Sequence, residues 1–255
     1  ATAKMFAAQG HNLLIHGRNS DKLKDTKAQL ATIENVGTVQ AYLADLSIVS
    51  EVKALANTVK SEQNSIDVLI NNAGVFKVPN PITQDGLDVR FIVNTIAPYI
   101  LTQELVPLLR ETSGNNSRVI NLSSAAQAPV DIDALLGNKQ LSDMEAYSQS
   151  KLAITMWTER LAEHYKDNGP IFFAVNPGSL LASKMVKEGF GLAGHDITIG
   201  ATILMRLSLE EALAEFSGQY FDNDSGKFSP PHPDGLHLPK SEKIIEVIEN
   251  MLAEI

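Results

Sequence analysis

Tyr147 and Lys151 are the pair of side chains in this sequence best suited to acid/base chemistry. They stand four residues apart in a segment with helical character, so both side chains lie on one helix face about one turn apart. An ammonium beside a phenol favours the phenolate, which moves a Tyr pKa of about 10 toward neutral pH. Such a phenol can donate and accept a proton. Because two such residues also occur at this spacing by chance, the motifs elsewhere in the sequence must decide whether the pair is catalytic.

Small and polar residues follow three apolar runs that we expect to be strands. These are Asn71-Asn72-Ala73-Gly74 after residues 66–70, Ser123-Ser124 after 118–122, and Asn176-Pro177-Gly178 after 171–175. Ligands of open parallel sheets bind beyond the carboxyl ends of the strands, and residues of this kind let a flat ligand approach the backbone. The alternative is that all three are ordinary strand-to-helix turns, which favour the same residue types.

Asn94 lies four residues before Pro98 in a segment predicted to be one long helix from about Thr83 to Arg110. Pro98 has no N–H to donate to the carbonyl of residue 94. That carbonyl would then be free to hold a water molecule leading towards Lys151. The alternative is a proline that kinks a surface helix and has no part in chemistry.

The elements that would position these residues alternate between helix and strand. Helices are predicted at 1–9, 21–34, 47–62, 83–110 and 145–165, and strands at 13–15, 38–43, 66–70, 118–122 and 171–175. Such alternation indicates parallel strands joined by helical crossovers. The predicted fold class is therefore α/β, with a doubly wound parallel sheet in a single domain spanning residues 1–255.

Local signals set several boundaries of these elements. Gly10 is expected to end the first helix in a left-handed conformation, and the turn before Asp21 supplies a cap for the second. Ser241 is expected to cap a closing helix with one apolar stripe. Stretches 125–142, 179–200 and 222–240 break the alternation; we expect the last two to form loops on the substrate side.

Composition excludes several classes of function. With 21 Lys and Arg against 30 Asp and Glu, the net charge of −9 argues against a nucleic-acid partner. The absence of Cys excludes disulfides, thiolate metal sites and thiol catalysis. We see neither a signal peptide nor an apolar run of 18 residues, so we expect a cytoplasmic protein without a membrane span. The six His residues lack metal-ligand spacing, and no metal is predicted.

Four motifs occur in order along the chain: Asn-Asn-Ala-Gly, Asn-Leu-Ser-Ser, Tyr-x-x-x-Lys and Asn-Pro-Gly. Together they resemble the short-chain dehydrogenase/reductase family over nearly the whole chain. That family is a Rossmann-type single domain that uses a nicotinamide cofactor. The resemblance implies that its catalytic tetrad falls on Asn94, Ser124, Tyr147 and Lys151. Ser124 is chosen over Ser123 because it is the second Ser of the family's pattern.

The resemblance also implies a role for each member of the tetrad. Ser124 would hydrogen-bond the substrate oxygen, while Tyr147 passes a proton to or from it as a hydride moves at the neighbouring carbon. Lys151 would lower the Tyr147 pKa and hydrogen-bond the nicotinamide ribose, and Asn94 would hold the relay water. The cofactor carries the redox chemistry, and the protein supplies orientation and charge.

Further residues would bind the cofactor by the same resemblance. Those lining its adenosine side are Asn72, Ala73 and Gly74, those beside the nicotinamide are Pro177 and Gly178, and the adenine-contacting pair is Asp45 with Leu46. For Asp45 the alternative is a plain carboxylate at a helix N-terminus.

Arg18 comes three residues after the predicted strand at 13–15, in the region where specificity for the non-phosphorylated cofactor would place an Asp or Glu. We expect Arg18 and Asn19 to clasp a 2′-phosphate, because a guanidinium matches phosphate geometry and is permanently charged. The predicted cofactor is therefore NADP, with NAD as the alternative. Arg18 could instead be an exposed turn residue with no ligand.

The sequence departs from the family's pattern in three places. No Thr-Gly-x-x-x-Gly-x-Gly loop occurs in the 255 residues. In the family that loop lies just before a helix resembling residues 1–9, so we expect the first strand and glycine loop of a longer protein to precede Ala1. The 23-residue step from Ser124 to Tyr147 is longer than in compact members and resembles the branch containing retinol-dehydrogenase-like enzymes. Ser183 stands where a Thr is more usual.

The predicted function is hydride transfer between NADP(H) and a small-molecule carbonyl or alcohol substrate, in a homodimer or homotetramer. A second enzyme class, the epimerases and dehydratases of the extended relatives, is disfavoured because those chains usually add a larger C-terminal substrate domain. The alternative from another class is a non-catalytic dinucleotide-binding or interaction protein of the same fold. The missing glycine loop favours that alternative, and the intact tetrad argues against it.

Overall fold

The computed structural model describes residues 1–111 and 116–254. Its strands are β1 (Leu13–Gly17), β2 (Val39–Leu43), β3 (Val68–Asn71), β4 (Arg118–Leu122), β5 (Ile171–Asn176), β6 (Tyr220–Asp222) and β7 (Lys227–Phe228). They form a two-stranded sheet, β1-β2, and a five-stranded sheet in the order β3-β4-β5-β6-β7. Within both sheets every pair is parallel except β6 with β7. The predicted parallel α/β architecture is confirmed.

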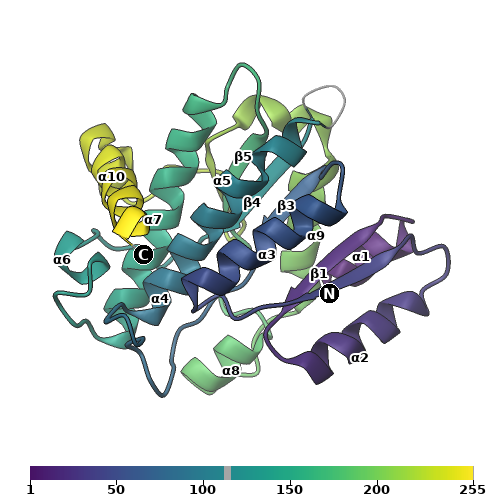
Figure 1. Cartoon of the computed structure of the whole chain (residues 1–255), viewed down its shortest axis with the longest axis horizontal. Coiled ribbons are helices and arrows are strands. Elements are labelled where there is room, and N and C mark those ends of the chain that lie inside the picture. Colours follow the sequence, from purple (N-terminus) through teal and green to yellow (C-terminus); the bar gives the residue numbers. More distant parts are fainter. Residues whose placement is uncertain (112–115, 255) are drawn as a thin grey trace.

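The two sheets share no strand pairing among the described residues. In the smaller sheet Leu13 lies opposite Val39, and in the larger one Val68 lies opposite Arg118. Figure 1 shows the β1-β2 sheet on the β3 side of the larger sheet.

Helices cover both faces of the larger sheet. They are α1 (Thr2–Ala8), α2 (Ser20–Ala31), α3 (Val49–Glu62), α4 (Val89–Phe91), α5 (Ala97–Arg110), α6 (Ile132–Leu135), α7 (Asp143–His164), α8 (Lys184–Phe190), α9 (Ile197–Leu209) and α10 (Leu238–Glu254). Helices α3, α5 and α7 lie side by side on one face, while α9, which contacts α1 and β4, lies behind (Figure 1). The sheet is therefore doubly wound. Helix α10 packs on the outer side of α7.

The long helix predicted from Thr83 begins six residues later, at Val89. Residues before it form a turn in which the Thr83 N–H donates to the Leu87 carbonyl, and the Asp88 carboxylate then accepts from the Arg90 N–H as an N-terminal cap. The sequence prediction was wrong there because this cap stands inside an apolar periodic pattern.

Pro98 follows a break in the regular α-helix. Residues Ile92–Ile96 instead form a π-helical turn, and the α-helix resumes at Ala97. Pro98 therefore stands in the first turn of α5, where its missing N–H costs little. The π-helical turn contains Asn94, and such turns often occur at functional sites.

The stretches predicted to be irregular contain short elements of their own. Helices α6 and α8, the hairpin strand β7 and the 3-10 turn Pro233–Leu236 lie within them, and α9 and β6 were not predicted at all. The closing helix α10 begins at Leu238, so Ser241 lies inside it, fully buried, instead of capping it. Its apolar stripe is confirmed at Ile244 and Ile248.

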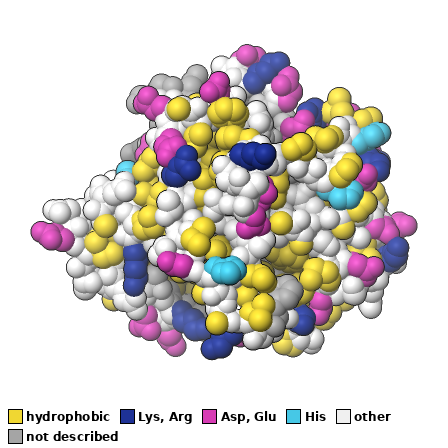
Figure 2. Space-filling model, turned by 180° about the vertical axis from the view of Figure 1, so that it is seen from behind, with side chains coloured by type: hydrophobic (Ala, Val, Ile, Leu, Met, Phe, Trp, Pro, Cys, Tyr) yellow, Lys and Arg dark blue, Asp and Glu magenta, His cyan; other side chains and the backbone are white. Residues whose placement is uncertain are grey.

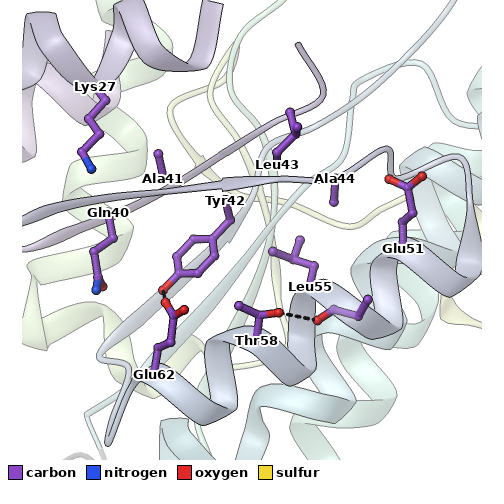
Figure 3. A pocket seen from close by; sticks show the side chains of 11 residues that line it. Lys27, Gln40, Ala41, Tyr42, Leu43, Ala44, Glu51, Leu55, Thr58 and Glu62 are labelled. Atoms are coloured by element: carbon purple, nitrogen blue, oxygen red, sulfur yellow. Dashed lines mark hydrogen bonds between the residues drawn. The ribbon is translucent and has the colours of Figure 1, made fainter. Parts of the chain in front are cut away.

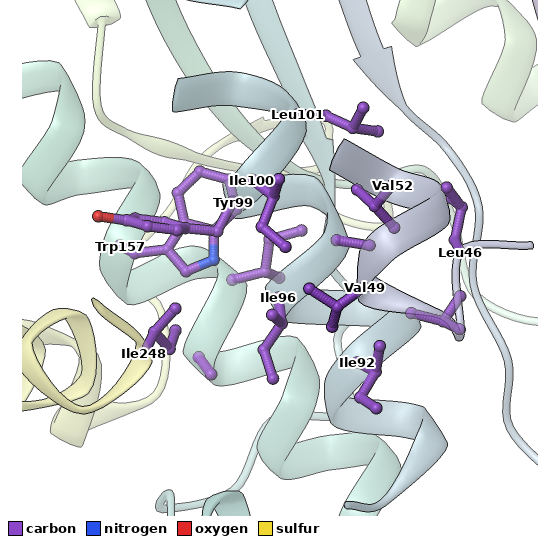
Figure 4. Close-up of a cluster of buried hydrophobic side chains, with 14 of the residues drawn as sticks. Leu46, Val49, Val52, Ile92, Ile96, Tyr99, Ile100, Leu101, Trp157 and Ile248 are labelled. Carbon is purple, nitrogen blue, oxygen red and sulfur yellow. The ribbon is translucent and has the colours of Figure 1, made fainter. Parts of the chain in front are cut away.

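The main hydrophobic core lies between the strands and helices α3, α5 and α7, and it extends to α10. Trp157 in α7 is fully buried, and its ring makes an edge contact with Tyr99 at 5.6 Å between centroids. Ile248 of α10 packs beside it (Figure 4). Trp157 is thus a core residue that a helix of the same chain covers.

The surface carries both signs of charge. On the face opposite Figure 1, acidic and basic side chains are interspersed around hydrophobic side chains that reach the surface near its middle (Figure 2). One helical run in the described residues, 89–110, is long and apolar enough to cross a membrane, but most of it is buried inside the protein. That is the pattern of a core helix.

Candidate active site

Tyr147 and Lys151 lie near the start of α7, which the chain fixes firmly. The Ser142 hydroxyl accepts from the Glu145 N–H, and the Glu145 carboxylate accepts from the Ser142 N–H at 3.0 Å, which completes a capping box. The fully buried guanidinium of Arg90 pairs with Asp88 at 2.6 Å and with Asp143. The first turn of the helix is therefore tied to α4.

Lys151 is almost completely buried, with 4% of its surface exposed. Its ammonium donates to the Leu122 carbonyl at the end of β4, at 2.7 Å. It lies 5.7 Å from the centroid of the Tyr147 ring. Because burial disfavours the charged form, the pKa of Lys151 falls to about 8.

The Tyr147 phenol is half-buried, and burial raises its pKa above the ordinary value. A hydrogen bond with the Ser124 side chain acts in the opposite direction but is the smaller effect. The direction differs from the sequence prediction, in which Lys151 lowers this pKa. The ammonium points to the Leu122 carbonyl, so desolvation dominates at the phenol.

The structure separates the two candidate serines. The Ser123 hydroxyl donates to the Lys151 carbonyl at 2.8 Å and shares a hydrogen bond with the Thr155 hydroxyl at 2.7 Å, so it faces the core side of α7. The Ser124 hydroxyl accepts from the Ala126 N–H at 3.1 Å and hydrogen-bonds Tyr147. Ser124 therefore contacts the Tyr147 phenol, whereas the contacts of Ser123 are with Lys151 and Thr155.

Asn94 is fully buried and joins two parts of the site. Its side-chain oxygen accepts from the Val75 N–H at 2.8 Å, and its amide donates to the Val75 carbonyl at 2.9 Å. The same amide donates to the Ser150 hydroxyl in α7 at 3.0 Å. A Cβ placed on Gly74 would lie 3.5 Å from both the Asn94 amide oxygen and the Lys151 ammonium. Asn94 and Lys151 therefore lie close to each other beside Gly74.

Arg18, Asn19 and Asp45 form a second group at the ends of β1 and β2. Arg18 is exposed, and the Asn19 side chain caps α2 by accepting from the Lys22 N–H at 2.9 Å. Burial raises the pKa of Asp45, but hydrogen bonds from Ser47 and the charge of Arg18 outweigh it and hold that pKa below its ordinary value. Arg18 and Asp45 therefore lie close enough to interact.

Asp45 forms a turn of its own before α3. Its carboxylate accepts from both the N–H and the hydroxyl of Ser47, at 2.9 and 2.7 Å. The N-terminal cap position of α3 is Ile48, so Asp45 does not serve as that cap. The neighbouring Leu46 turns its side chain into the core (Figure 4), which leaves its backbone as the part that could face a ligand.

The remaining predicted residues lie at strand ends. Asn72 is exposed just after β3, and Ala73 packs partly against the core. After β5, Gly178 has a φ of +128°, a conformation that favours glycine. The Pro177 carbonyl accepts from the Asn223 amide at 2.9 Å, which fixes this loop to the segment after β6.

Helix α8 and the loop after Gly74 contribute residues that the sequence analysis missed. The Phe76 ring makes an edge contact with Tyr147 at 5.2 Å between centroids. Gly189 of α8 lies so close that a Cβ there would be 2.7 Å from the Phe76 ring, and the Lys77 ammonium donates to the Gly189 carbonyl at 3.0 Å. The Met185 methyl lies 3.6 Å from the Cβ position of Gly74. No sequence motif marked these contacts, because α8 was predicted to be loop.

Two hollows of the described surface lie elsewhere. One of about 420 Å³ runs along β2 between α2 and α3, where Tyr42 donates to Glu62 (Figure 3). Another of about 690 Å³ lies between α7 and the segment 228–236. Tyr147 lines neither of these hollows. The candidate site is therefore located by its group of neighbouring titratable side chains and not by the volume of a hollow.

Comparison with known proteins supports the architecture and the motifs together. Residues 1–190 match the profile of the short chain dehydrogenase family. Human "Retinol dehydrogenase 13" is 30% identical over 247 residues, covering 90% of this chain and 74% of that protein. Bovine "Retinol dehydrogenase 12" is 30% identical over 233 residues, covering 87% and 73%.

Solved structures agree in fold. The "Pseudomonas aeruginosa RhlG/NADP active-site complex" superposes with a TM-score of 0.71 at 23% identity, covering 88% of this chain and 90% of that one. A metagenomic short-chain oxidoreductase in complex with NADP gives a TM-score of 0.60 at 22% identity, covering 81% and 83%. The family match and the retinol dehydrogenase relatives confirm the family and branch that the motifs indicated. The chain therefore belongs to the short-chain dehydrogenase family of NAD(P)-dependent oxidoreductases.

Proposed function

We propose that this protein transfers a hydride between NADP(H) and a carbonyl or alcohol substrate, with Tyr147 as the acid/base. The observation that carries the proposal is the convergence of the Ser124 hydroxyl, the Tyr147 phenol and the Lys151 ammonium at the end of β4. A hydroxyl and a phenol that already hydrogen-bond each other can both reach one substrate oxygen.

Tyr147 acts as the proton donor in the reducing direction. Because burial raises its pKa, the phenol is protonated at neutral pH and can give its proton to the developing alkoxide. The Ser124 hydroxyl holds the substrate oxygen beside it. NADPH, when bound, supplies the hydride to the carbonyl carbon. In the oxidising direction the same two side chains act in reverse.

Lys151 and Asn94 support this step from within the protein. The Lys151 ammonium, with a pKa of about 8, is largely charged at neutral pH and stabilises negative charge that develops near Tyr147. It is also the residue that would hydrogen-bond the nicotinamide ribose. Asn94 keeps residue 75 and α7 together, and we assign it the relay water of the family's mechanism.

The residues around this group fit a dinucleotide. Gly74 lies beside Asn94 and Lys151, and Gly178 lies beside Leu181; an added Cβ at either glycine would meet side-chain atoms at 3.4 to 3.8 Å and would take up space beside the backbone. We propose that these glycines, with Asn72, Ala73 and Pro177, line the cofactor, and that Asp45 and Leu46 contact its adenine. The exposed guanidinium of Arg18, with Asn19, would hold the 2′-phosphate, which supports NADP with NAD as the alternative.

The substrate is proposed to be a lipophilic aldehyde or alcohol. Phe76 packs on Tyr147, and Met185 lies beside Gly74, so apolar side chains surround the reacting group. Relatives named retinol dehydrogenase and polyprenol dehydrogenase support the same class. The loops 179–200 and 222–240 stay predicted substrate-side segments.

The cellular location and the oligomeric state of the protein are also proposed. We propose that the protein is cytoplasmic, that it forms a homodimer or homotetramer, and that each chain is a single domain. Light scattering after gel filtration would test the assembly, since one chain has a mass of 27.6 kDa.

Oxidation of NADPH tests the function directly. The intact protein should bind NADPH, detected by its fluorescence, and consume it in the presence of decanal or all-trans-retinal. Tyr147→Phe should still bind NADPH but not consume it. NADPH binding without turnover of any aldehyde or ketone in a broad panel would instead support the non-catalytic alternative.

A further inference from the structure

Two residues outside the predicted tetrad hold Ser124 in place. The Ser124 carbonyl oxygen accepts a hydrogen bond from the Tyr220 hydroxyl at 3.1 Å and a second from the Gln127 amide at 3.0 Å. Tyr220 comes from β6, two strands away from β4 in the sheet, and Gln127 comes from the loop that follows β4. Both lone-pair positions of this carbonyl are therefore used.

The orientation of the Gln127 amide is set by a third segment. The His232 backbone N–H donates to the Gln127 side-chain oxygen at 2.8 Å. Because a backbone N–H can only donate, the amide oxygen must face His232 and the NH₂ group must face Ser124. The NH₂ group also lies 3.4 Å from the Ser123 hydroxyl. The hydrogen bond from His232, in the Pro-rich segment, thus orients Gln127 so that its NH₂ group donates to the Ser124 carbonyl.

The Tyr220 hydroxyl acts as a hydrogen-bond donor because it stays protonated. Its side chain is buried, with 6% of the residue exposed. Burial, with the charges of Asp222 and Asp224, raises the pKa of this phenol far above the ordinary value. The hydroxyl therefore keeps its proton at any pH suited to an assay, and in its contact with a carbonyl it can only donate.

We propose that Tyr220 and Gln127 are positioning residues for the reaction: by fixing the Ser124 carbonyl they aim the Ser124 hydroxyl at Tyr147. The carbonyl and the side chain share one Cα, so a rotation of this backbone would carry the hydroxyl away from the phenol. The Ala126 N–H, which donates to the same hydroxyl, fixes it from the other side. This inference rests on the proposed function, since it assigns the alignment that Ser124 needs there.

Tyr220→Phe is the principal test, because it keeps the ring and removes the donor. With NADPH and the best aldehyde of the panel, we expect kcat to fall about three- to tenfold while KM for NADPH changes less than about twofold. The hydrogen bond from Ser124 lowers the Tyr147 pKa, so the kinetic pKa assigned to Tyr147 should rise in this variant. A purely structural role would leave that kinetic pKa unmoved.

Gln127→Glu is the second test, because it keeps the shape and the acceptor for His232. It replaces the NH₂ donor by a carboxylate oxygen that repels the Ser124 carbonyl, so we expect a larger loss of kcat than in Tyr220→Phe.

Tyr165→Phe is the matched control. Its hydroxyl donates to Gln103 at 3.0 Å, and it lies 18 residues beyond Tyr147, about 27 Å along a helix, so kcat and pH profile should stay as in the wild type.

A double variant shows whether the effect passes through Ser124. In a Ser124→Ala background, Tyr220→Phe should cause no further loss of residual kcat. The inference is overturned if Tyr220→Phe leaves kcat and the kinetic pKa unchanged, or if its full effect persists in Ser124→Ala. Full activity in Tyr147→Phe and Ser124→Ala would instead overturn the proposed function itself, so the two failures are distinguishable.

Discussion

The residues assigned to catalysis and those assigned to cofactor choice are held in different ways. Asn94 is fully buried and Lys151 nearly so, and hydrogen bonds tie both to neighbouring elements. Arg18, by contrast, is exposed on the turn after β1, with the charge of Asp45 near it. One region is a packed network and the other is a charged turn at the surface.

The difference follows from what each region has to do. Proton transfer requires atoms placed to within a fraction of an ångström, which only buried, mutually hydrogen-bonded side chains maintain. Recognition of a phosphate requires a permanent positive charge with a planar fork of donors, and such a group works from a solvated turn. Substitutions should therefore have large effects in the first region and modest effects in the second.

Tyr147→Phe should have the largest effect. The ring and its contact with Phe76 remain, but the transferable proton is lost, so turnover should vanish while NADPH binding persists. Steady-state NADPH oxidation and fluorescence binding measure the two properties separately. Retention of more than about a tenth of the wild-type kcat, a loss under about 1.4 kcal/mol, would show that Tyr147 is not the acid/base.

Arg90→Met should be the most destabilising change near the catalytic helix. It leaves the Asp88 carboxylate, which is 4% exposed, without its guanidinium partner, at a cost of about 3–5 kcal/mol in the free energy of unfolding. Urea denaturation measures this cost. The control is Arg206→Met, which breaks an exposed pair with Glu210 and should cost less than about 1 kcal/mol. Equal losses in both variants would contradict the view of Arg90 as a buried anchor of α7.

Lys151→Met should change stability in a way that depends on pH. The pKa of Lys151 is about 8 in the folded protein against an ordinary 10.5, so the folded state binds this proton less tightly than the unfolded state. The wild type should therefore gain up to about 3 kcal/mol relative to the Met variant as pH rises from about 8 to about 10.5. Denaturation midpoints of both proteins at pH 7 and pH 10 measure it. A difference that does not change with pH would mean that the lysine is not desolvated.

The sheet could be predicted from the sequence because its strands leave periodic signals, and the tetrad was proposed there because its residues stand in short motifs. The strand at 118–122 appears with its predicted bounds, and Gly10 adopts the expected left-handed conformation with a φ of +83°. The proposed tetrad spans 57 residues of the chain: Ser124 follows β4, Asn94 lies in the π-helical turn Ile92–Ile96, and Tyr147 and Lys151 lie in α7.

The contacts that Tyr220 and Gly189 make near the site had no periodic or motif signal in the sequence. Tyr220 reaches the Ser124 carbonyl from a three-residue strand, and Gly189 meets Phe76 from a helix of seven residues. Elements this short show no clear period, and side chains that meet across more than 90 residues leave no local pattern. The start of the long helix was also missed, because the Asp88 cap overrides the apolar pattern around it.

Arg18→Ala should have the smallest effect and should alter the choice of cofactor. Removal of an exposed guanidinium leaves the fold intact, because its neighbour Asn19 still caps α2. If Arg18 holds the 2′-phosphate, affinity for NADPH should fall at least about fivefold, a little over 1 kcal/mol, while affinity for NADH stays within about twofold. Fluorescence titration with each cofactor measures the ratio, and Arg18→Lys, which keeps the charge but not the fork, should recover part of it. Equal affinity of the wild type for both cofactors, unchanged in Arg18→Ala, would make Arg18 an ordinary turn residue and leave the packed network as the whole of the functional site.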